Sequence, residues 1–233
     1  MTFTSILDQV RTFMGVDSTQ WTTTAITNSV NNWLDTVTGY AIGADRRFQW
    51  DDTNHTKLPV GTTNLIANQS EYSFLTDEQG NRILTLTRID IKDSSGIWRQ
   101  LEPIDQVEIS PVALDEFMKT AGTPQYYDKT NDNVIRLYPA SKDSITSGLK
   151  FYFQRTPSYF AITDTNKEPG VANLLQRGAV ISAAYDGAVA LGLQNLQPLS
   201  VEMQREDQKM KDYFNNRNND QAPIFRGKNR CAR

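Results

Sequence analysis

The sequence predicts an α+β protein: helices from both ends of the chain form one bundle, and the middle of the chain is inserted as an antiparallel β-sandwich or barrel-like lobe. Two observations lead to this prediction. Apolar residues recur at steps of three and four in residues 1–57 and 161–217, which is the period of an amphipathic helix. Residues 58–160 instead contain short β-prone runs separated by Pro, Gly, Asn and Asp clusters, which are typical of strands joined by turns.

Residues 1–57 are predicted to hold the first two helices of the bundle. The apolar stripe of residues 3–14 stops at Gly15, and glycine commonly ends a helix because it adopts the left-handed conformation without strain. The threonines at 22–24 can cap a second helix, since a threonine hydroxyl accepts a hydrogen bond from a free backbone N–H of the first turn. The apolar period of this second helix continues to Tyr40.

Short runs within residues 58–160 are predicted as strands. They are residues 63–67, 72–74, 83–93, 97–101, 125–128, 134–138 and 149–155. In the longest strand the alternation of apolar residues changes phase between Thr87 and Arg88, which indicates a β-bulge. The composition of residues 93–96 is that of a turn, so the run that follows, with Trp98, is expected to pair with the longest strand as a hairpin. Residues 110–119 are ambiguous between a loop and a brief helix.

Residues 161–217 are predicted to hold the last two helices. The first of them, residues 171–193, is dense in small residues, and because each internal glycine costs roughly 1 kcal/mol against alanine, another surface must come close to it. The residues predicted for subunit packing, against a helix of the same or a neighbouring chain, are Gly178, Ala183, Ala184, Gly187 and Ala188. Pro198 is expected to break this helix, and Ser200 to cap the next one, with Glu202 in its first turn.

Residues 218–233 lack any helical or strand period and are predicted to form an extended docking tail. An apolar pair, Ile224 and Phe225, comes before a basic cluster. The residues predicted to dock on a partner protein or a neighbouring subunit are Ile224, Phe225, Arg226, Lys228, Arg230 and Arg233. The apolar pair can enter a groove and the cations can meet acidic residues around it.

Composition excludes several classes of function. The 24 basic and 27 acidic residues give a net charge of −3, so no overall positive field draws the protein to nucleic acid or to an anionic membrane. Cys231 and His55 are the single residues of their types, which rules out an internal disulfide and disfavours Ser-His-Asp and Cys-His catalysis. No run of apolar residues is long enough to predict a membrane span.

Candidate catalytic chemistry is sparse. Asp51, Asp52 and His55 could supply metal ligands, but a polar loop explains these residue types better than a metal centre does. No glycine-rich phosphate loop is present in the sequence. We therefore expect no enzyme activity, no cofactor and no metal.

The order of several segments carries a family resemblance. These segments are Trp33-Leu34, Arg46–Trp50, Asn64–Phe74, the strand from Trp98 to Ile104, Gly122–Tyr127, Val134–Ala140, Phe151–Arg155 and the two C-terminal helices. Taken in this order they resemble the head-to-tail adaptors, or connectors, of tailed bacteriophages. The resemblance extends over nearly the whole chain. Among such adaptors, the sequence is similar to the tail accessory and tail tubular A types, which bind the portal.

The resemblance implies a structural protein of the virion, located in the neck between head and tail and assembled in the host cytoplasm. Such a protein would form a dodecameric ring of identical subunits that binds the portal protein, extends the DNA channel and offers a platform for a tail or nozzle protein. Double-stranded DNA would pass through without sequence recognition, and no membrane would be involved. The alternatives are a carboxylate-dependent hydrolase with its site in the β lobe, and another tail protein such as a terminator or tube subunit.

Overall fold

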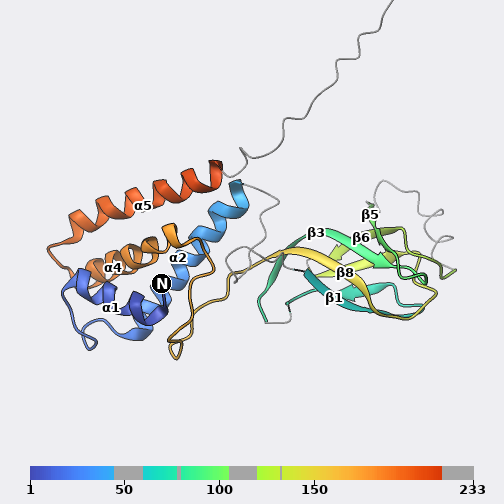
Figure 1. The fold of residues 1–233 in the computed structure, drawn as a ribbon, viewed down its shortest axis with the longest axis horizontal. Helices are drawn as coiled ribbons and strands as arrows, with labels where there is room; N and C mark the ends of the chain where they lie inside the picture. The colour runs from blue at the N-terminus through green and yellow to red at the C-terminus, as the bar shows by residue number, and fades with distance from the viewer. Residues whose placement is uncertain (45–59, 78–79, 105–119, 132, 217–233) are drawn as a thin grey trace, which may run out of the picture.

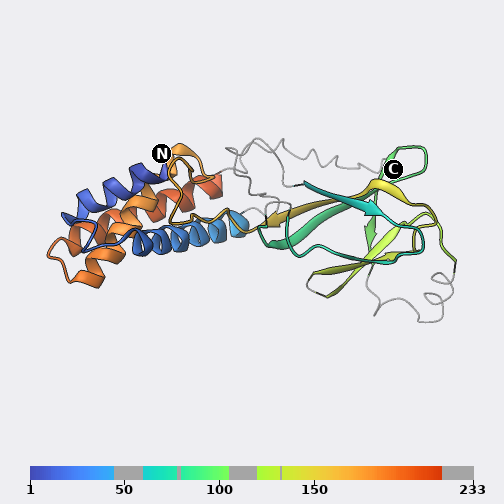
Figure 2. The same ribbon diagram turned by 90° about the horizontal axis from the view of Figure 1, so that it is seen from below.

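A computed structural model describes residues 1–44, 60–77, 80–104, 120–131 and 133–216. It confirms the α+β class: a helical bundle and a two-sheet β lobe lie end to end (Figure 1). The bundle contains α1 (Phe3–Met14), α2 (Thr23–Ala44), α4 (Arg177–Leu191) and α5 (Leu196–Asn216), with a short 3₁₀ helix, η1 (Asn173–Leu175), before α4. The view from below shows the same division, with the C-terminal end of α2 directed toward the β lobe (Figure 2).

The helix α1 begins and ends where the sequence predicts, and α2 begins at the predicted threonines but continues to Ala44, past Tyr40. The Thr2 hydroxyl accepts from the backbone N–H of Ser5, and Gly15 closes α1 in the left-handed conformation (φ 68°). The N–H of Gly15 donates to two carbonyl groups of the last turn, and because φ is left-handed a residue with a Cβ would be strained at this position. Thr22 caps α2 by accepting from the N–H of Ala25 at 3.3 Å.

The boundary between the last two helices differs from the prediction. The helix α4 ends because Gly192 takes the left-handed conformation (φ 64°), six residues before the proline. Pro198 lies in the first turn of α5, where its missing N–H is not needed for the helical hydrogen-bond pattern. Ser200 is inside the helix, with its hydroxyl donating to the carbonyl of Gln197, so its assignment as the cap was wrong.

The four helices surround one apolar core. Its fully or nearly fully buried members come from every helix of the bundle and from the segment before α4, and they include Phe3, Val10, Ile26, Trp33, Val37, Phe160, Leu175, Ala184, Met210 and Phe214. The helix α4 contacts α1, α2 and α5, whereas α1 and α2 contact each other only slightly. It is therefore the central element of the bundle.

The β lobe is a sandwich of two four-stranded sheets. One sheet has the order β1 (Val60–Leu65), β8 (Ile145–Arg155), β3 (Ile83–Lys92), β4 (Trp98–Gln100), and the other has the order β2 (Glu71–Ser73), β7 (Val134–Tyr138), β6 (Tyr126–Asn131), β5 (Glu102–Pro103). A second apolar core, including Leu65, Phe74, Ile89, Leu101, Ile135, Leu137, Leu149 and Phe151, lies between the sheets. This core is separate from that of the bundle, as expected for an inserted lobe.

The predicted irregularities of the longest strand are present. The pairing of β3 with β8 shifts register between Leu86 and Arg88, which confirms the bulge. The turn at Asp93–Gly96 is closed by the N–H of Gly96, which donates to the carbonyl of Asp93 at 2.9 Å, with Gly96 at φ 83°. The antiparallel pairing of β3 with β4 confirms the hairpin.

Several strands of the lobe differ from the prediction; β1, for example, begins at Val60 and ends at Leu65, whereas residues 63–67 were predicted. The strand β5 is two residues long and pairs in parallel with β6, and so short a parallel pair leaves no local signal in the sequence. The strand β8 begins four residues earlier than predicted, because Ile145 and its neighbours pair with β1 across a polar, glycine-containing stretch. The ambiguous residues 110–119 lie outside the described part of the chain.

The tight approach of α4 to its neighbours leads to a stability prediction. A Cβ at Gly187 would lie 2.9 Å from Cε2 of Trp21 and would also collide with Met14, whereas a Cβ at Gly39 in α2 would meet nothing within 4 Å. Gly187→Ala should therefore destabilise the protein by roughly 1–3 kcal/mol through overpacking. Gly39→Ala should stabilise it by up to ~1 kcal/mol, because alanine is the better helix former. Urea denaturation measures the free energy of unfolding of both variants. Equal changes in this free energy would contradict the close packing of α4 at Gly187.

Candidate functional site

The small residues of α4 lie inside the chain's own bundle. Gly178 faces the indole of Trp33, where an added Cβ would come within 2.9 Å of the ring nitrogen. Gly187 faces Met14 and Trp21 in the same way. The three alanines of the predicted set, Ala183, Ala184 and Ala188, are fully buried in the bundle core. All five residues are therefore buried in the interior of the chain's own bundle.

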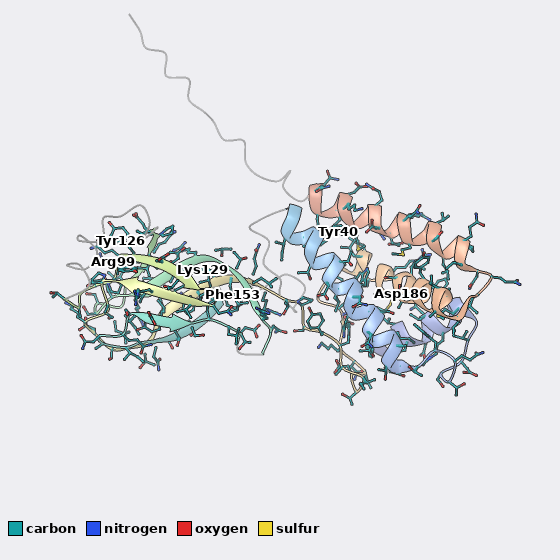
Figure 3. All side chains as sticks on the ribbon, turned by 180° about the vertical axis from the view of Figure 1, so that it is seen from behind. Tyr40, Arg99, Tyr126, Lys129, Phe153 and Asp186 are labelled. Atoms are coloured by element: carbon teal, nitrogen blue, oxygen red, sulfur yellow. The ribbon has the colours of Figure 1, made fainter. Side chains whose placement is uncertain are left out.

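The outer surface of the bundle along α5 is strongly charged. Glu202 pairs with Arg177 of α4 at 3.1 Å, and Glu206, although only 5% exposed, pairs with Lys209 at 3.2 Å. The Tyr40 hydroxyl, near the end of α2, hydrogen-bonds Asp207, and this bond raises the pKa of Tyr40. The side-chain view shows Tyr40 close to the end of α2 (Figure 3). These contacts fix α5 across α2 and α4.

The segment between β8 and α4 is held on the bundle by specific contacts. The amide side chain of Asn31 donates to the carbonyl of Phe160 at 3.0 Å and accepts from its N–H at 2.9 Å. The ring of Phe160 stacks on Phe3 with a centroid separation of 4.6 Å. The Tyr159 hydroxyl donates to Asp35 at 2.5 Å, and burial together with this hydrogen bond raises the pKa of Tyr159 to about 12. The chain therefore enters the bundle along a fixed path.

A buried ion pair lies where β8 ends. Nε of Arg155 is 3.2 Å from the carboxylate of Asp77, and the two side chains are 7% and 5% exposed. Asp77 also accepts from the backbone N–H of Asn81 at 2.7 Å. The pair ties the end of β8 to the loop after β2, at the end of the lobe from which the chain passes to the bundle.

An open depression of about 530 Å³ lies at the opposite end of the β lobe. Its lining is polar and includes Asp93, Arg99, Glu102 and Tyr126, and Arg99 pairs with Asp93 at 3.0 Å. Figure 3 places Arg99 and Tyr126 at the end of the lobe remote from the bundle. Hydrogen bonds from the N–H groups of the turn, first of all that of Ile97, lower the pKa of Asp93 and keep it ionised. Such a carboxylate holds a turn; it is not poised for proton transfer at neutral pH.

Other sequence-predicted candidates fall outside the described residues. The docking residues of the tail, Ile224, Phe225, Arg226, Lys228, Arg230 and Arg233, are among them, as are Asp51, Asp52 and His55. Among the residues that the structure describes, no three His, Cys, Asp or Glu side chains gather closely enough to hold a metal ion. Within the same residues, no helix combines the length and apolar character needed to cross a bilayer.

Comparison with known protein families shows which family the chain belongs to. The model of the SU10 adaptor protein family matches residues 1–227. The chain belongs to the SU10 adaptor protein family. A search among curated proteins finds no match.

Family membership makes the protein a phage adaptor, that is, a structural protein. It confirms the predicted resemblance at the level of phage adaptors, because the match extends over nearly the whole chain. The family description names no particular type of adaptor. The bundle and the sandwich are therefore the two parts of a structural adaptor.

Sequence reasoning missed two polar contacts between distant segments of the chain. Asp77 and Arg155 are far apart in sequence, and nothing in either neighbourhood marks them as a pair. Asp186 is a second example: burial in the bundle raises the pKa of its carboxyl, while the hydroxyl of Ser29 hydrogen-bonds it. Its place within the bundle is visible in Figure 3. The sequence did offer one signal for this contact, because Asp186 is a lone acidic residue among the small residues of α4.

The buried ion pair leads to a second stability prediction. Arg155→Met should cost about 3–5 kcal/mol, because it removes one partner of a buried ion pair. The matched control is Arg205→Met, which breaks an exposed pair with Glu202 (3.6 Å) and should cost under about 1 kcal/mol. Denaturant titration followed by tryptophan fluorescence measures both changes. Similar decreases in the free energy of unfolding for the two variants would show that the buried pair contributes no more to stability than the exposed one.

Asp186 leads to a prediction on pH dependence. Its pKa is raised in the folded state, so folding favours the protonated form and stability is lost as the pH rises through the raised pKa. Asp186→Asn should therefore be more stable than wild type at pH 7, and the difference should shrink as the pH falls toward the ordinary aspartate value. The control, Asp8→Asn at an exposed position of α1, should change the free energy of unfolding by under about 0.5 kcal/mol. A wild type as stable as Asp186→Asn at pH 7 would contradict the assignment.

Proposed function

We propose that this phage adaptor is the head-to-tail adaptor of its virion: a ring of identical subunits that binds the portal protein, extends the DNA channel and carries the tail or a nozzle protein. The observation that carries the proposal is the family match over residues 1–227. By its resemblance to the tail accessory and tail tubular A types, the ring has twelve subunits and is located in the virion neck.

The physical properties of the chain support this role. A net charge of −3 suits a conduit through which DNA slides without sticking. Two lobes with separate cores let one lobe contact the head while the other contacts the tail or the neighbouring subunits. The chemistry of the described residues fits a protein that acts by binding and catalyses no reaction, because its charged groups pair with one another along α5 and at the ends of the β lobe.

Each domain predicted from the sequence has its own role in the proposed function. In that prediction, residues 1–57 and 161–217 make up the bundle, residues 58–160 the β lobe and residues 218–233 the docking tail, although Tyr159 and Phe160 already contact the bundle. The tail reaches the portal or an adjacent subunit with Ile224 and Phe225 as apolar anchors, and its cations meet acidic residues around the groove.

The direct test uses portal-bearing heads from a phage whose adaptor gene is disabled. Purified protein is added, the heads are separated from unbound subunits, and the portal vertex is imaged by electron microscopy. A ring of added density below the portal supports the proposal. Heads that bind the protein elsewhere, or do not bind it, contradict it.

Deletion of residues 218–233 tests the role of the tail. The truncated protein should keep its fold, because the core of the bundle, in the described part of the chain, is complete with residues 3–214. Its binding to portal-bearing heads should weaken and become more sensitive to salt, since the apolar anchors and the cationic cluster are lost. Sedimentation with heads at two salt concentrations measures the effect, and circular dichroism checks the fold. Unchanged binding would remove the docking role.

A further inference from the structure

The outer face of the sheet formed by β1, β8, β3 and β4 carries an excess of positive charge. Along β8 the side chains alternate: Leu149, Phe151 and Phe153 are buried in the sandwich core, so Lys150 and Tyr152 point to the opposite, outer side. The strand β8 therefore has one side in the apolar core and one polar side that is directed away from it.

Pairing in register places residues of the neighbouring strands on the same face. Arg88 lies directly opposite Tyr152, and Lys92 of β3 lies opposite Trp98 of β4. Directly paired residues of antiparallel strands project to the same side. The resulting surface, called the basic face from here on, is made of Arg88, Lys92, Lys150, Trp98 and Tyr152.

The contacts within the basic face hold its cations over its aromatic rings. Nζ of Lys150 is 3.9 Å from the centre of the Trp98 ring, and Nζ of Lys92 is 6.0 Å from it. The carboxylate on this face, Asp90, is itself buried and pairs with Arg88 at 2.6 Å. Among the described residues, Lys92 and Lys150 are therefore the cations of this face that Asp90 does not neutralise, and they lie beside a tryptophan that can act as a binding anchor.

The outer face of the other sheet carries the opposite charge. Arg136 lies between Ile135 and Leu137, which are buried in the core, so its own side chain is on the outer side. Glu71 and Asp128 are paired with Arg136 from the two neighbouring strands. The arginine contacts Glu71 at 2.7 Å and is therefore already engaged within the face.

Glu102 adds a further carboxylate at the edge of this sheet. It is exposed and pairs in register with Tyr126. The surface made of Glu71, Asp128, Glu102 and Arg136, called the acidic face, has three carboxylates for one cation among the described residues. The sandwich consequently has one basic and one acidic outer face.

We propose that the basic face of one subunit binds the acidic face of a second copy of this chain. The inference rests on the proposed ring, and it names the surfaces that hold the ring together. Because the two faces are the opposite outer sides of one sandwich, each bound copy keeps one face free for the next. Such a head-to-tail contact builds a closed ring when the rotation between copies closes.

Charge complementarity favours a second copy over nucleic acid as the occupant. The chain is acidic overall, and the basic face has three cations with a carboxylate in their midst, which is sparse for a groove that follows a phosphate backbone. The acidic face offers a matching number of carboxylates. Opposite charges of this kind orient two partners and select against the wrong pairing.

Charge reversal on one face at a time tests the proposal. The first variant combines Lys92→Glu with Lys150→Glu, and the second combines Glu102→Lys with Asp128→Lys, which leaves the pair of Arg136 and Glu71 in place. Each variant alone presents two faces of like charge, whereas a 1:1 mixture restores opposite charges at every contact. The control, Lys142→Glu with Arg205→Glu, makes the same change of charge at exposed positions outside both faces.

The measurement is the amount of protein retained on portal-bearing heads that lack the adaptor. We expect each variant alone to be retained about tenfold less than wild type, and the mixture and the control to be retained like wild type. Misfolded subunits would not be rescued by mixing, so recovery in the mixture also shows that both variants fold.

Three results would overturn the inference. They are wild-type retention of both variants, failure of the mixture to recover, and loss in the first variant alone that follows the DNA content of the heads, which would assign the basic face to DNA. If wild type itself is not retained, the proposed function fails, and this outcome is distinct from all three.

Discussion

The close approach that α4 permits is the constraint on which the bundle depends. With glycine at the two positions that face Trp33, Trp21 and Met14, the backbone of α4 comes near enough for these large side chains to contact it directly. A helix of larger residues would hold α1, α2 and α5 apart and open the core that they share. The indoles fill the space that the small side chains leave, so the two sets of residues are complementary in volume.

The path of the chain between the lobes depends on this bundle. Phe160 can be clamped by Asn31 and stacked on Phe3 only because α1 and α2 are already fixed by α4. On the other side, the ion pair of Arg155 with Asp77 fixes the last residue of β8. Few residues therefore separate two firmly held points, and the C-terminal connection from sandwich to bundle is short and well anchored.

Local signals in the sequence were sufficient for most elements of the fold. The end of α1 follows from Gly15, and the bulge in β3 follows from the change of phase between Thr87 and Arg88, because each depends on a few adjacent residues. Pro198 misled for the same reason: a proline in a first turn and a proline that breaks a helix look alike without knowledge of where the helix begins.

The surfaces were less accessible to sequence reasoning. The separation of Lys150 and Asp128 onto opposite outer faces depends on strand register and on which sheet each strand joins, and both are set by pairing between distant segments. The partner of α4's small residues was likewise left open between the same and a neighbouring chain, and in the structure Gly178 and Gly187 face large side chains of α1, α2 and the segment between them. Membership of the adaptor family was within reach because the order of many weak segments is preserved along one chain.

The bundle is built from both ends of the chain, and this has a consequence for synthesis on the ribosome. The helices α1 and α2 leave the ribosome first, but their main partners, α4 and α5, follow only after the whole sandwich has been made. At ~5–20 residues per second, the delay is on the order of ten seconds. During that interval the apolar side chains of Ile26, Trp33 and Val37 have no helix α4 to cover them. The sandwich can close in the meantime, while the apolar faces of the first helices stay uncovered until α4 has been made.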